Sequence, residues 1–352
     1  MENSQHILVT GGAGFIGSHV CDVLIEAGYR VRVMDALLPP THDGMLPSWT
    51  NDNIEFIRGD VRNKEDWKKV LAGIDSVIHL AAYMDYHLDF STYVDVNLRS
   101  LALLFECIEE EKLPIKKIIA ASSQSVYGEG KFECKKHGLQ YLPPRSEAQM
   151  KKGDWEQHCP VCGSGVEPLP ELEDDELRPL IPYAISKSAS ETLLMALGKQ
   201  YGIPGVVLRY SIVLGPRQSF RHYYSGALRS FAANVLNKEP IQMNEDAMQL
   251  RDFVHVEDAA RAHLLVLEDE GANFQVFNVG RGQGTRVLEL AELVAKEAGI
   301  PFEPKINSRY RVGGTRHALM NIDKLRSLGW EPRLGLEDMV YDYLRWVIQF
   351  EG

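Results

Sequence analysis

The sequence has few cysteines and no long apolar run, and its net charge has the wrong sign for a nucleic-acid binder. Five cysteines in 352 residues are too few for a disulfide scaffold. No stretch of about 18 apolar residues is present, so no membrane span is expected. The net charge of -11 argues against a nucleic-acid partner, because neutralising phosphates needs a basic face. These absences indicate an ordinary globular protein.

The N-terminus has neither a basic region nor the long apolar core of a secretory signal. We therefore predict a cytoplasmic protein, whose cysteines would be thiols or metal ligands rather than disulfides. The length suits one large α/β domain with an appended lobe, or two domains.

Short apolar runs alternate with amphipathic stretches through the first 128 residues. This alternation is typical of βαβ units and of a parallel sheet buried on both faces. The predicted strands are His6–Thr10, Tyr29–Asp35, Ile54–Arg58, Ser76–Ala82, Lys117–Ser122 and Gly205–Tyr210. The predicted helices are Ser18–Ala27, Lys64–Ala72, Thr92–Glu111, Tyr183–Tyr201 and Leu336–Phe350.

The pattern predicts a doubly wound α/β fold of the Rossmann type with a smaller C-terminal substrate lobe. We assign residues 1–210 to the dinucleotide-binding domain and 211–352 mainly to the lobe, with 251–280 returning to the first domain. An insert at 129–180 interrupts the alternation with a polar, proline-rich and locally charged sequence. A structureless loop of this length is unusual in a compact domain, so something is expected to fold it.

A glycine-rich turn follows the first predicted strand in the sequence TGGAGFIG at residues 10–17. Gly11, Gly14 and Gly17 suit a tight turn, a close backbone approach to a pyrophosphate and close helix–strand packing. Asp35 ends the second strand, where a carboxylate binds the adenosine ribose and disfavours a 2′-phosphate. NAD is therefore the predicted cofactor, although Arg32 lies close enough in sequence to weaken the preference over NADP.

Further cofactor contacts are predicted along the same edge of the sheet, where the strands end. Phe15 and Ile16 belong to the turn. Asp60 and Val61 follow the third strand, where Asp60 could reach the adenine edge. Ala81 and Ala82 end the fourth strand, where small side chains admit the cofactor. Tight core packing is the alternative, and it would be preferred without the other motifs.

A tyrosine and a lysine four residues apart, Tyr183 and Lys187, share one face of a predicted helix. A cationic Lys187 would lower the pKa of the phenol and let Tyr183 act as a base nearer neutral pH. Ser123, at the end of a strand, could position a substrate hydroxyl. An exposed i,i+4 pair is the alternative reading, but the glycine turn and the serine-rich strand end favour a catalytic one.

These motifs together resemble the extended short-chain dehydrogenases/reductases, in the group of NAD-dependent nucleotide-sugar epimerases and dehydratases. The resemblance rests on TGGAGFIG, SSQSVYG at 122–128, YAISK at 183–187, LRYSIVLGPRQ at 208–218 and RDFVHVEDAARAH at 251–263. It implies a catalytic set of Ser123, Tyr183 and Lys187 on a Rossmann domain with bound NAD. Asn97 matches the family's helix asparagine near the cofactor.

The resemblance also narrows the reaction. Family dehydratases carry an Asp-Glu pair where this chain has Gln124 and Ser125, which cannot supply the acid and base for water elimination. We predict a nucleotide-diphosphate-sugar 4-epimerase that oxidises C4, lets the 4-keto sugar rotate and reduces it again. A decarboxylase or 4-ketoreductase remains the alternative enzyme. A non-catalytic NAD-binding sensor or scaffold is the alternative of another class.

Substrate contacts are expected mainly from the second half of the chain. Guanidinium groups bind phosphates with two parallel hydrogen bonds, and Arg251 within RDFVH is the strongest candidate. Arg217 is a second candidate, and Arg311 and Arg316 match the family's C-terminal arginine region. Ser125 is a further predicted substrate contact. Ile212 replaces the asparagine amide common in the family, so that contact is in doubt.

The insert contains Cys134-x2-His137 and Cys159-x2-Cys162. Three thiolates and one imidazole at this spacing suit a closed, tetrahedral structural zinc site, which would also fold the insert. Three idle thiols, or His158 as a ligand, are the alternatives. Insert-bearing chains of this kind resemble a bacterial subset of the family, the dTDP-L-rhamnose 4-epimerase-like group. The helices Thr92–Glu111 and Tyr183–Tyr201 resemble the family's dimer helices, so a homodimer is expected by analogy.

Overall fold

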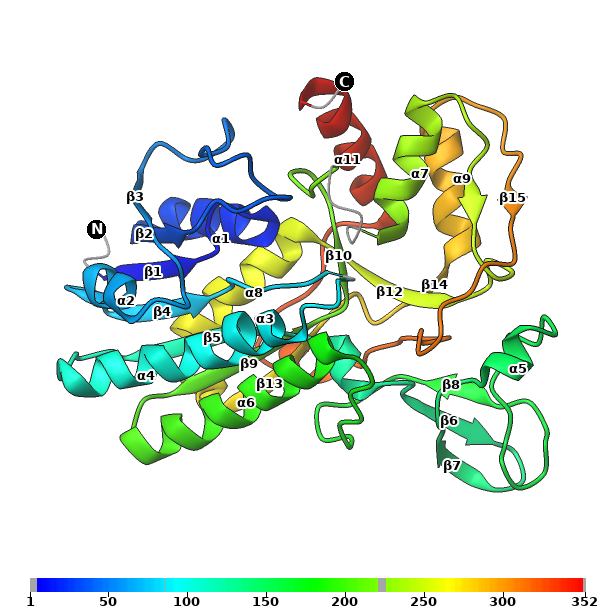
Figure 1. The fold of residues 1–352 in the computed structure, drawn as a ribbon, viewed down its shortest axis with the longest axis horizontal. Coiled ribbons are helices and arrows are strands. Elements are labelled where there is room, and N and C mark those ends of the chain that lie inside the picture. The colour runs from blue at the N-terminus through cyan, green and yellow to red at the C-terminus, as the bar shows by residue number, and fades with distance from the viewer. Residues whose placement is uncertain (1–4, 86, 221–225, 351–352) are drawn as a thin grey trace.

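Seven parallel strands form the central sheet of the chain (Figure 1). The computed structural model describes residues 5–85, 87–220 and 226–350. In spatial order the strands are β13 (Gln275–Val279), β9 (Gly205–Tyr210), β5 (Lys117–Ser123), β4 (Ser76–His79), β1 (His6–Thr10), β2 (Arg30–Asp35) and β3 (Ile54–Arg58). β1, β4 and β9 are buried at every residue, as continuous apolar runs in a covered parallel sheet predict.

Helices cover both faces of this sheet. One apolar core joins it to α1 (Phe15–Glu26), α8 (Val256–Glu268) and α10 (Asp323–Arg326). The other joins it to α2 (Lys64–Leu71), α4 (Ser100–Glu110) and α6 (Pro182–Tyr201). Pro182 fixes the first turn of α6, and Gly202 ends the helix in the left-handed region at φ 72°. The three layers confirm the predicted doubly wound α/β class.

The predicted helix Thr92–Glu111 is the main local departure from expectation. The structure divides it into α3 (Phe90–Val94), a π-helical turn over Asp95–Arg99 and α4. A π-turn adds one residue to the turn and re-aims the side chains that follow it. Asn97 lies within that turn, buried at the end of the sheet where the predicted site lies.

The second half builds a smaller lobe on a third apolar core. Its sheet contains β10 (Ile212–Leu214), β12 (Leu250–His255) and β14 (Gly284–Arg286), and β11 (Gln242–Met243) pairs with β15 (Lys305–Ile306). Its helices are α7 (Gly226–Leu236), α9 (Val287–Glu297) and α11 (Leu336–Phe350). Between lobe segments the chain returns to the first domain, where α8 packs on α1 and β13 pairs with β9.

The insert folds as a separate antiparallel sheet that projects from the rest of the chain (Figure 1). It contains β6 (Lys131–Cys134), β7 (Gly138–Tyr141), β8 (Glu167–Leu169) and the short helix α5 (Glu147–Met150). The amide of Arg178 donates to the carbonyl of Val126 at 3.0 Å, so the two ends of the insert meet. Within the described ranges, no helix is long and apolar enough to cross a bilayer.

Candidate active site

The glycine turn brings the start of α1 against the ends of β1 and β4. A Cβ on Gly17 would lie 2.1 Å from the carbonyl oxygen of Gly11, and one on Gly11 would lie 2.8 Å from the amide of Ala81. Among the described residues outside the immediate chain neighbours of Gly14, such a Cβ would meet the Gly11 carbonyl oxygen at 3.2 Å and nothing else within 4 Å. The space beside Gly14 at the N-terminus of α1 is therefore open, which fits a pyrophosphate.

Asp35 lies beside the glycine turn, at the end of β2. Its carboxylate accepts hydrogen bonds from the amides of Ala13 at 3.2 Å and Leu37 at 2.9 Å. These bonds orient the side chain at the edge where the predicted ribose would lie. Asp60 is instead held by Arg62, whose guanidinium donates to both carboxylate oxygens at 2.6–3.0 Å. Its predicted adenine contact would therefore compete with this pair.

Asn97 connects neighbouring elements rather than facing open space. Its Oδ1 accepts from the amide of Tyr83 at 2.7 Å, and its Nδ2 donates to the Tyr83 carbonyl at 3.0 Å and to the Ser186 hydroxyl at 2.9 Å. Both amide hydrogens are thus used. Asn97 thus links the segment after β4 to helix α6, and a contact of this residue with the cofactor stays a prediction.

The structure brings Ser123, Tyr183 and Lys187 together at the end of β5 and the start of α6. The Tyr183 and Ser123 side chains are hydrogen-bonded. Lys187 Nζ donates to the carbonyl of Ala121 at 2.9 Å. Burial raises the pKa of Tyr183 to about 12, and the bond to Ser123 opposes that rise. The lowering contribution thus comes from Ser123, not from Lys187 as the sequence predicts.

The pKa of Lys187 is also shifted. It is 4 % exposed, and burial lowers its pKa to about 8 against the opposing charge of Glu191. Glu191, one turn further along α6, forms a buried ion pair with Arg209 at 2.7 Å and accepts a hydrogen bond from Ser122. This support was not predicted, although Arg209 lies in the segment LRYSIVLGPRQ and Glu191 follows Lys187 at helical spacing.

A second buried pair adjoins the catalytic group. Tyr210 pairs in register with Ser123 across β9 and β5, and its hydroxyl is 2.7 Å from Nε2 of His263. Nδ1 of His263 lies 3.0 Å from the carbonyl of Ala259, to which it can donate, so Nε2 is then the acceptor. Burial lowers the pKa of His263 to about 4, which keeps the ring neutral.

The four predicted arginines have different surroundings. Arg217 pairs with Asp22 of α1 at 2.6 Å, and Arg311 is exposed. Arg251 donates to the carbonyls of Leu250, Thr315 and Arg316 at 2.7–2.8 Å.

Arg316 does not fit its predicted role. It is fully buried, and its guanidinium is bonded to carboxylates of Glu156, Glu245 and Asp246 at 2.5–3.1 Å. A guanidinium enclosed by carboxylates is not available to a phosphate, so the structure places Arg316 in a structural network instead. The predicted contact Ser125 lies in the turn Gln124–Tyr127, and its Oγ is buried without a hydrogen-bond partner among the residues that the structure describes.

The four predicted metal ligands converge at the end of the β6–β7 hairpin. Their ligand atoms all lie within 4.8 Å of one another. Sγ of Cys134 lies 3.8 Å from Sγ of Cys162, and Nδ1 of His137 lies 3.6 Å from Cys134 Sγ and 3.4 Å from Cys159 Sγ. Tetrahedral zinc with ordinary bond lengths separates two sulfurs by about 3.8 Å and a sulfur and a nitrogen by about 3.5 Å.

His158 is not part of this group. Its Nε2 contacts the Asp154 carboxylate at 3.0 Å, so the alternative ligand is not supported. Hydrogen bonds from Ser164 lower the pKa of Cys162 to about 6, which favours the thiolate that a metal needs.

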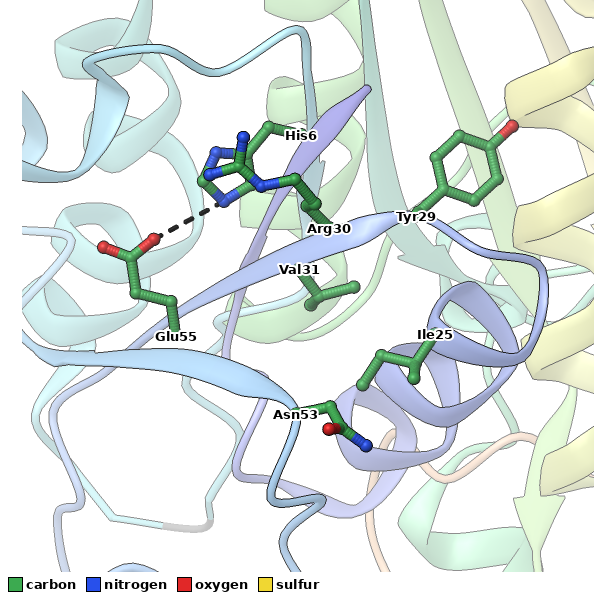
Figure 2. A pocket seen from close by; sticks show the side chains of 7 residues that line it. All are labelled: His6, Ile25, Tyr29, Arg30, Val31, Asn53 and Glu55. Carbon is green, nitrogen blue, oxygen red and sulfur yellow. Dashed lines mark ion pairs between the residues drawn. The ribbon is translucent and has the colours of Figure 1, made fainter. Parts of the chain in front are cut away.

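The cavity drawn in Figure 2 lies at the opposite end of the sheet from the glycine turn and Ser123. It has a volume of about 200 Å³ and is lined by residues at the amino ends of β1, β2 and β3, among them His6, Arg30 and Glu55. His6 and Glu55 face each other across it at 3.5 Å. Ligands of open α/β sheets bind outside the carboxyl ends of the strands, so this cavity is separate from the candidate site.

The sequence was compared with models of known protein families. Residues 7–152 and 159–280 match the family model described as NAD dependent epimerase/dehydratase family. The chain belongs to this family. The two matched ranges meet within the insert, between Lys152 and Cys159.

Two relatives are 32% identical to the chain. One is a dTDP-L-rhamnose 4-epimerase of Burkholderia thailandensis, with 99% of this chain and 96% of the relative aligned. The other is a putative UDP-glucose 4-epimerase of Methanocaldococcus jannaschii, with 97% and 98% aligned. The predicted resemblance to the dTDP-L-rhamnose 4-epimerase-like group is confirmed.

Solved structures of the family agree over the whole chain. A UDP-glucose 4-epimerase of Thermotoga maritima with UDP-glucose superposes with a TM-score of 0.79 at 30% identity, covering 99% of this chain and 100% of that one. A UDP-glucuronic acid 4-epimerase of Bacillus cereus with UDP-glucuronic acid and NAD gives 0.78 at 27% identity, covering 98% and 99%. The relatives named here are thus nucleotide-sugar 4-epimerases, as the sequence predicts for this chain.

Proposed function

We propose that this protein is an NAD-dependent 4-epimerase of a nucleotide-diphosphate sugar. The observation that carries the proposal is the convergence of Ser123, Tyr183 and Lys187 at the carboxyl edge of the sheet, the edge at which the glycine turn follows β1. The absence of the dehydratase Asp-Glu pair at Gln124 and Ser125 supports epimerisation over elimination. The identified epimerase relatives support it further.

The residues fit the cofactor. The turn formed by Gly11 and Gly14, packed closely through Gly17, would hold the pyrophosphate, and Asp35 would hold the adenosine ribose. NAD, when bound, would accept the hydride from C4 of the sugar and return it to the opposite face of the 4-keto form. Because NAD would be regenerated within one turnover, the proposed reaction would need no outside reductant.

The chain itself moves the proton. Tyr183 would accept the C4 hydroxyl proton as that alcohol is oxidised and return it on reduction. Ser123, already hydrogen-bonded to Tyr183, would orient the same hydroxyl. The pKa of Tyr183 at about 12 is too high for a base at neutral pH, so cationic charge brought close to the phenol must lower it in the working complex.

Tyr183→Phe tests this role. We expect the rate of epimerisation to fall by about 10²–10⁴, because the general acid–base group is lost, while NAD stays bound. Sugar stereochemistry is followed by NMR over a panel of UDP- and dTDP-sugars, and Tyr201→Phe at the far end of α6 serves as the control. Undiminished conversion by Tyr183→Phe removes this residue from the mechanism, and loss of carbon dioxide from a uronic acid substrate identifies a decarboxylase instead.

The insert is proposed to hold one structural zinc ion through Cys134, His137, Cys159 and Cys162. The interatomic distances of the four ligands match a tetrahedral site, and four protein ligands leave no open position for catalysis. Elemental analysis is expected to find one zinc per chain in the wild type and much less in Cys159→Ser, whereas Cys21→Ser is the control. Wild-type protein without stoichiometric metal contradicts this part of the proposal.

The proposal also includes a cytoplasmic homodimer. All five cysteines are free, which suits a reducing compartment. Apolar side chains on α3 and α6 are exposed, with Phe90 at 54 %, Val94 at 49 % and Ile185 at 53 %. These two helices are in contact, and we propose that a second copy covers the exposed groups. Sedimentation gives the mass of the particle in solution, and comparing the wild type with Ile185→Asp tests whether this face forms the dimer.

A further inference from the structure

A network of charged groups, centred on the buried side chains of Arg145, Glu245 and Arg316, joins the insert to the segment 310–317 of the second half. The guanidinium of Arg316 is bonded to Glu156 of the insert as well as to Glu245 and Asp246 of the lobe. Arg145 of the insert, 4 % exposed, donates to Glu245 at 2.9 and 3.0 Å and to the carbonyl of Gly314 at 3.0 Å. Two insert side chains thus reach directly into the lobe.

The loop that follows the catalytic strand meets the same network. Oε2 of Glu129 accepts from Gln157 of the insert at 3.1 Å and from the amide of Arg316 at 3.3 Å. The hydroxyl of Thr315 donates to the carbonyl of Gly128 at 3.0 Å. The aromatic rings of Trp155 and Tyr310 extend the contact, with centroids 6.1 Å apart. The insert, the loop after Ser123 and the segment 310–317 therefore meet in one place.

This segment determines where the candidate phosphate ligands lie. The Arg251 guanidinium is held by the carbonyls of Thr315 and Arg316. Arg311 lies three residues before Gly314, whose carbonyl accepts from Arg145. A displacement of the segment would therefore move both arginines together. Binding of a diphosphate by two guanidinium groups depends steeply on such positions.

We propose that Glu156 and Arg145 are positioning residues for nucleotide-sugar binding. They fix the segment 310–317 from the insert side, and through it the arginines at the diphosphate end of the site. The inference rests on the proposed function. It gives the insert a role beyond the proposed metal site, because Glu156 and Arg145 lie in the insert and contact the second half of the chain directly.

Glu156→Gln is the sharpest test, because it removes one charge at constant size. The Glu156 side chain is 50 % exposed, and Arg316 keeps Glu245 and Asp246 as partners, so the fold is expected to survive. We expect the KM for the best nucleotide sugar, and the Kd of UDP or dTDP measured by calorimetry, to rise about tenfold, because the variant weakens the two hydrogen bonds from Arg316 and the contact with His317. The kcat, the NAD content and the zinc content stay within twofold of the wild type.

Glu147→Gln is the matched control. It makes the same change on α5 of the insert, where Glu147 is exposed and pairs only with Lys151 among the contacts described. Its KM and Kd are expected to equal those of the wild type. A similar rise in both variants overturns the proposal, because it shows a general effect of charge. A fall in kcat at constant KM in Glu156→Gln also overturns the proposal, because a residue that positions the diphosphate ligands should change KM and Kd rather than kcat.

The outcomes also separate this inference from the proposed function. If the wild type converts the sugar and Glu156→Gln matches it in KM and Kd, only the positioning role is overturned. If the wild type converts no nucleotide sugar and binds neither UDP nor dTDP, both proposals are overturned. Should Glu156→Gln fail to fold, Glu156→Asp, which keeps the charge and shortens its reach to Arg316, is judged by the same KM, Kd and kcat criteria.

Discussion

Replacing Lys187 by methionine should make the nucleotide-free protein more stable at neutral pH while removing its activity. Burial lowers the pKa of this lysine from 10.5 to about 8. Because the folded value lies below the unfolded one, the cost of burying the charge is full below pH 8. It declines as pH rises towards 10.5 and is absent above that.

The magnitude follows from the two pKa values. A difference of this size corresponds to about 3 kcal/mol of unfolding free energy at pH 7. Methionine also loses the hydrogen bond to the Ala121 carbonyl, which offsets about 1 kcal/mol. We therefore expect Lys187→Met to be about 2 kcal/mol more stable than the wild type at pH 7. By pH 9.5 about 2 kcal/mol of the burial cost has gone, so the two proteins should then be about equal.

Urea unfolding of both proteins at pH 7 and pH 9.5 measures this difference. Lys199→Met, an exposed change on the same helix, controls for loss of a lysine in general and should show no such pH dependence. A Lys187→Met variant less stable than the wild type at pH 7, or a difference that is the same at both pH values, would refute the reasoning. Confirmation would show that the protein keeps a charge at this position against its own stability, as a catalytic role requires.

Two further substitutions test the framework of the site. Gly17→Ala places a Cβ 2.1 Å from the Gly11 carbonyl oxygen. We therefore expect the free energy of unfolding to fall by about 1–3 kcal/mol and NAD to bind more weakly in a titration. Gly165→Ala is the control and should change neither quantity, because a Cβ there meets no atom within 4 Å beyond its chain neighbours in the described part of the chain. Arg209→Met leaves the Glu191 carboxylate buried without its cation, and urea unfolding should show a loss of about 3–5 kcal/mol, whereas a loss below about 1 kcal/mol would contradict the buried pair.

The local elements near the cofactor end were predictable because their signals are local. Strands His6–Thr10, Ile54–Arg58 and Gly205–Tyr210 agree with the structure to the residue, since each is a short apolar run with polar flanks. The glycine turn and the Tyr183–Lys187 pair depend on spacings within a single turn or helix. The cluster of Cys134, His137, Cys159 and Cys162 likewise follows from two short motifs.

Side-chain partners that are distant in sequence could not be predicted. Nothing local to Arg316 indicates that Glu156, 160 residues earlier, would neutralise it. The pKa of Tyr183 depends on how deeply the phenol is buried, which the spacing to Lys187 does not show. Asn97 is predicted to lie within one continuous helix, but the π-helical turn that directs it towards Ser186 leaves no clear mark in the sequence.

The repeated passage of the chain between the central sheet and the lobe limits how the enzyme can open. Only Ser211 separates β9 from β10, and β12 runs directly into α8, which is packed on α1. The strand β13 returns to the sheet before β14 leaves it again. Several short, buried connections cannot all serve as one hinge, so a swing of the lobe as a rigid body is disfavoured. Entry and exit of ligands should therefore depend on local loop movements, and their rates should respond to changes in those loops more than to changes in the connections.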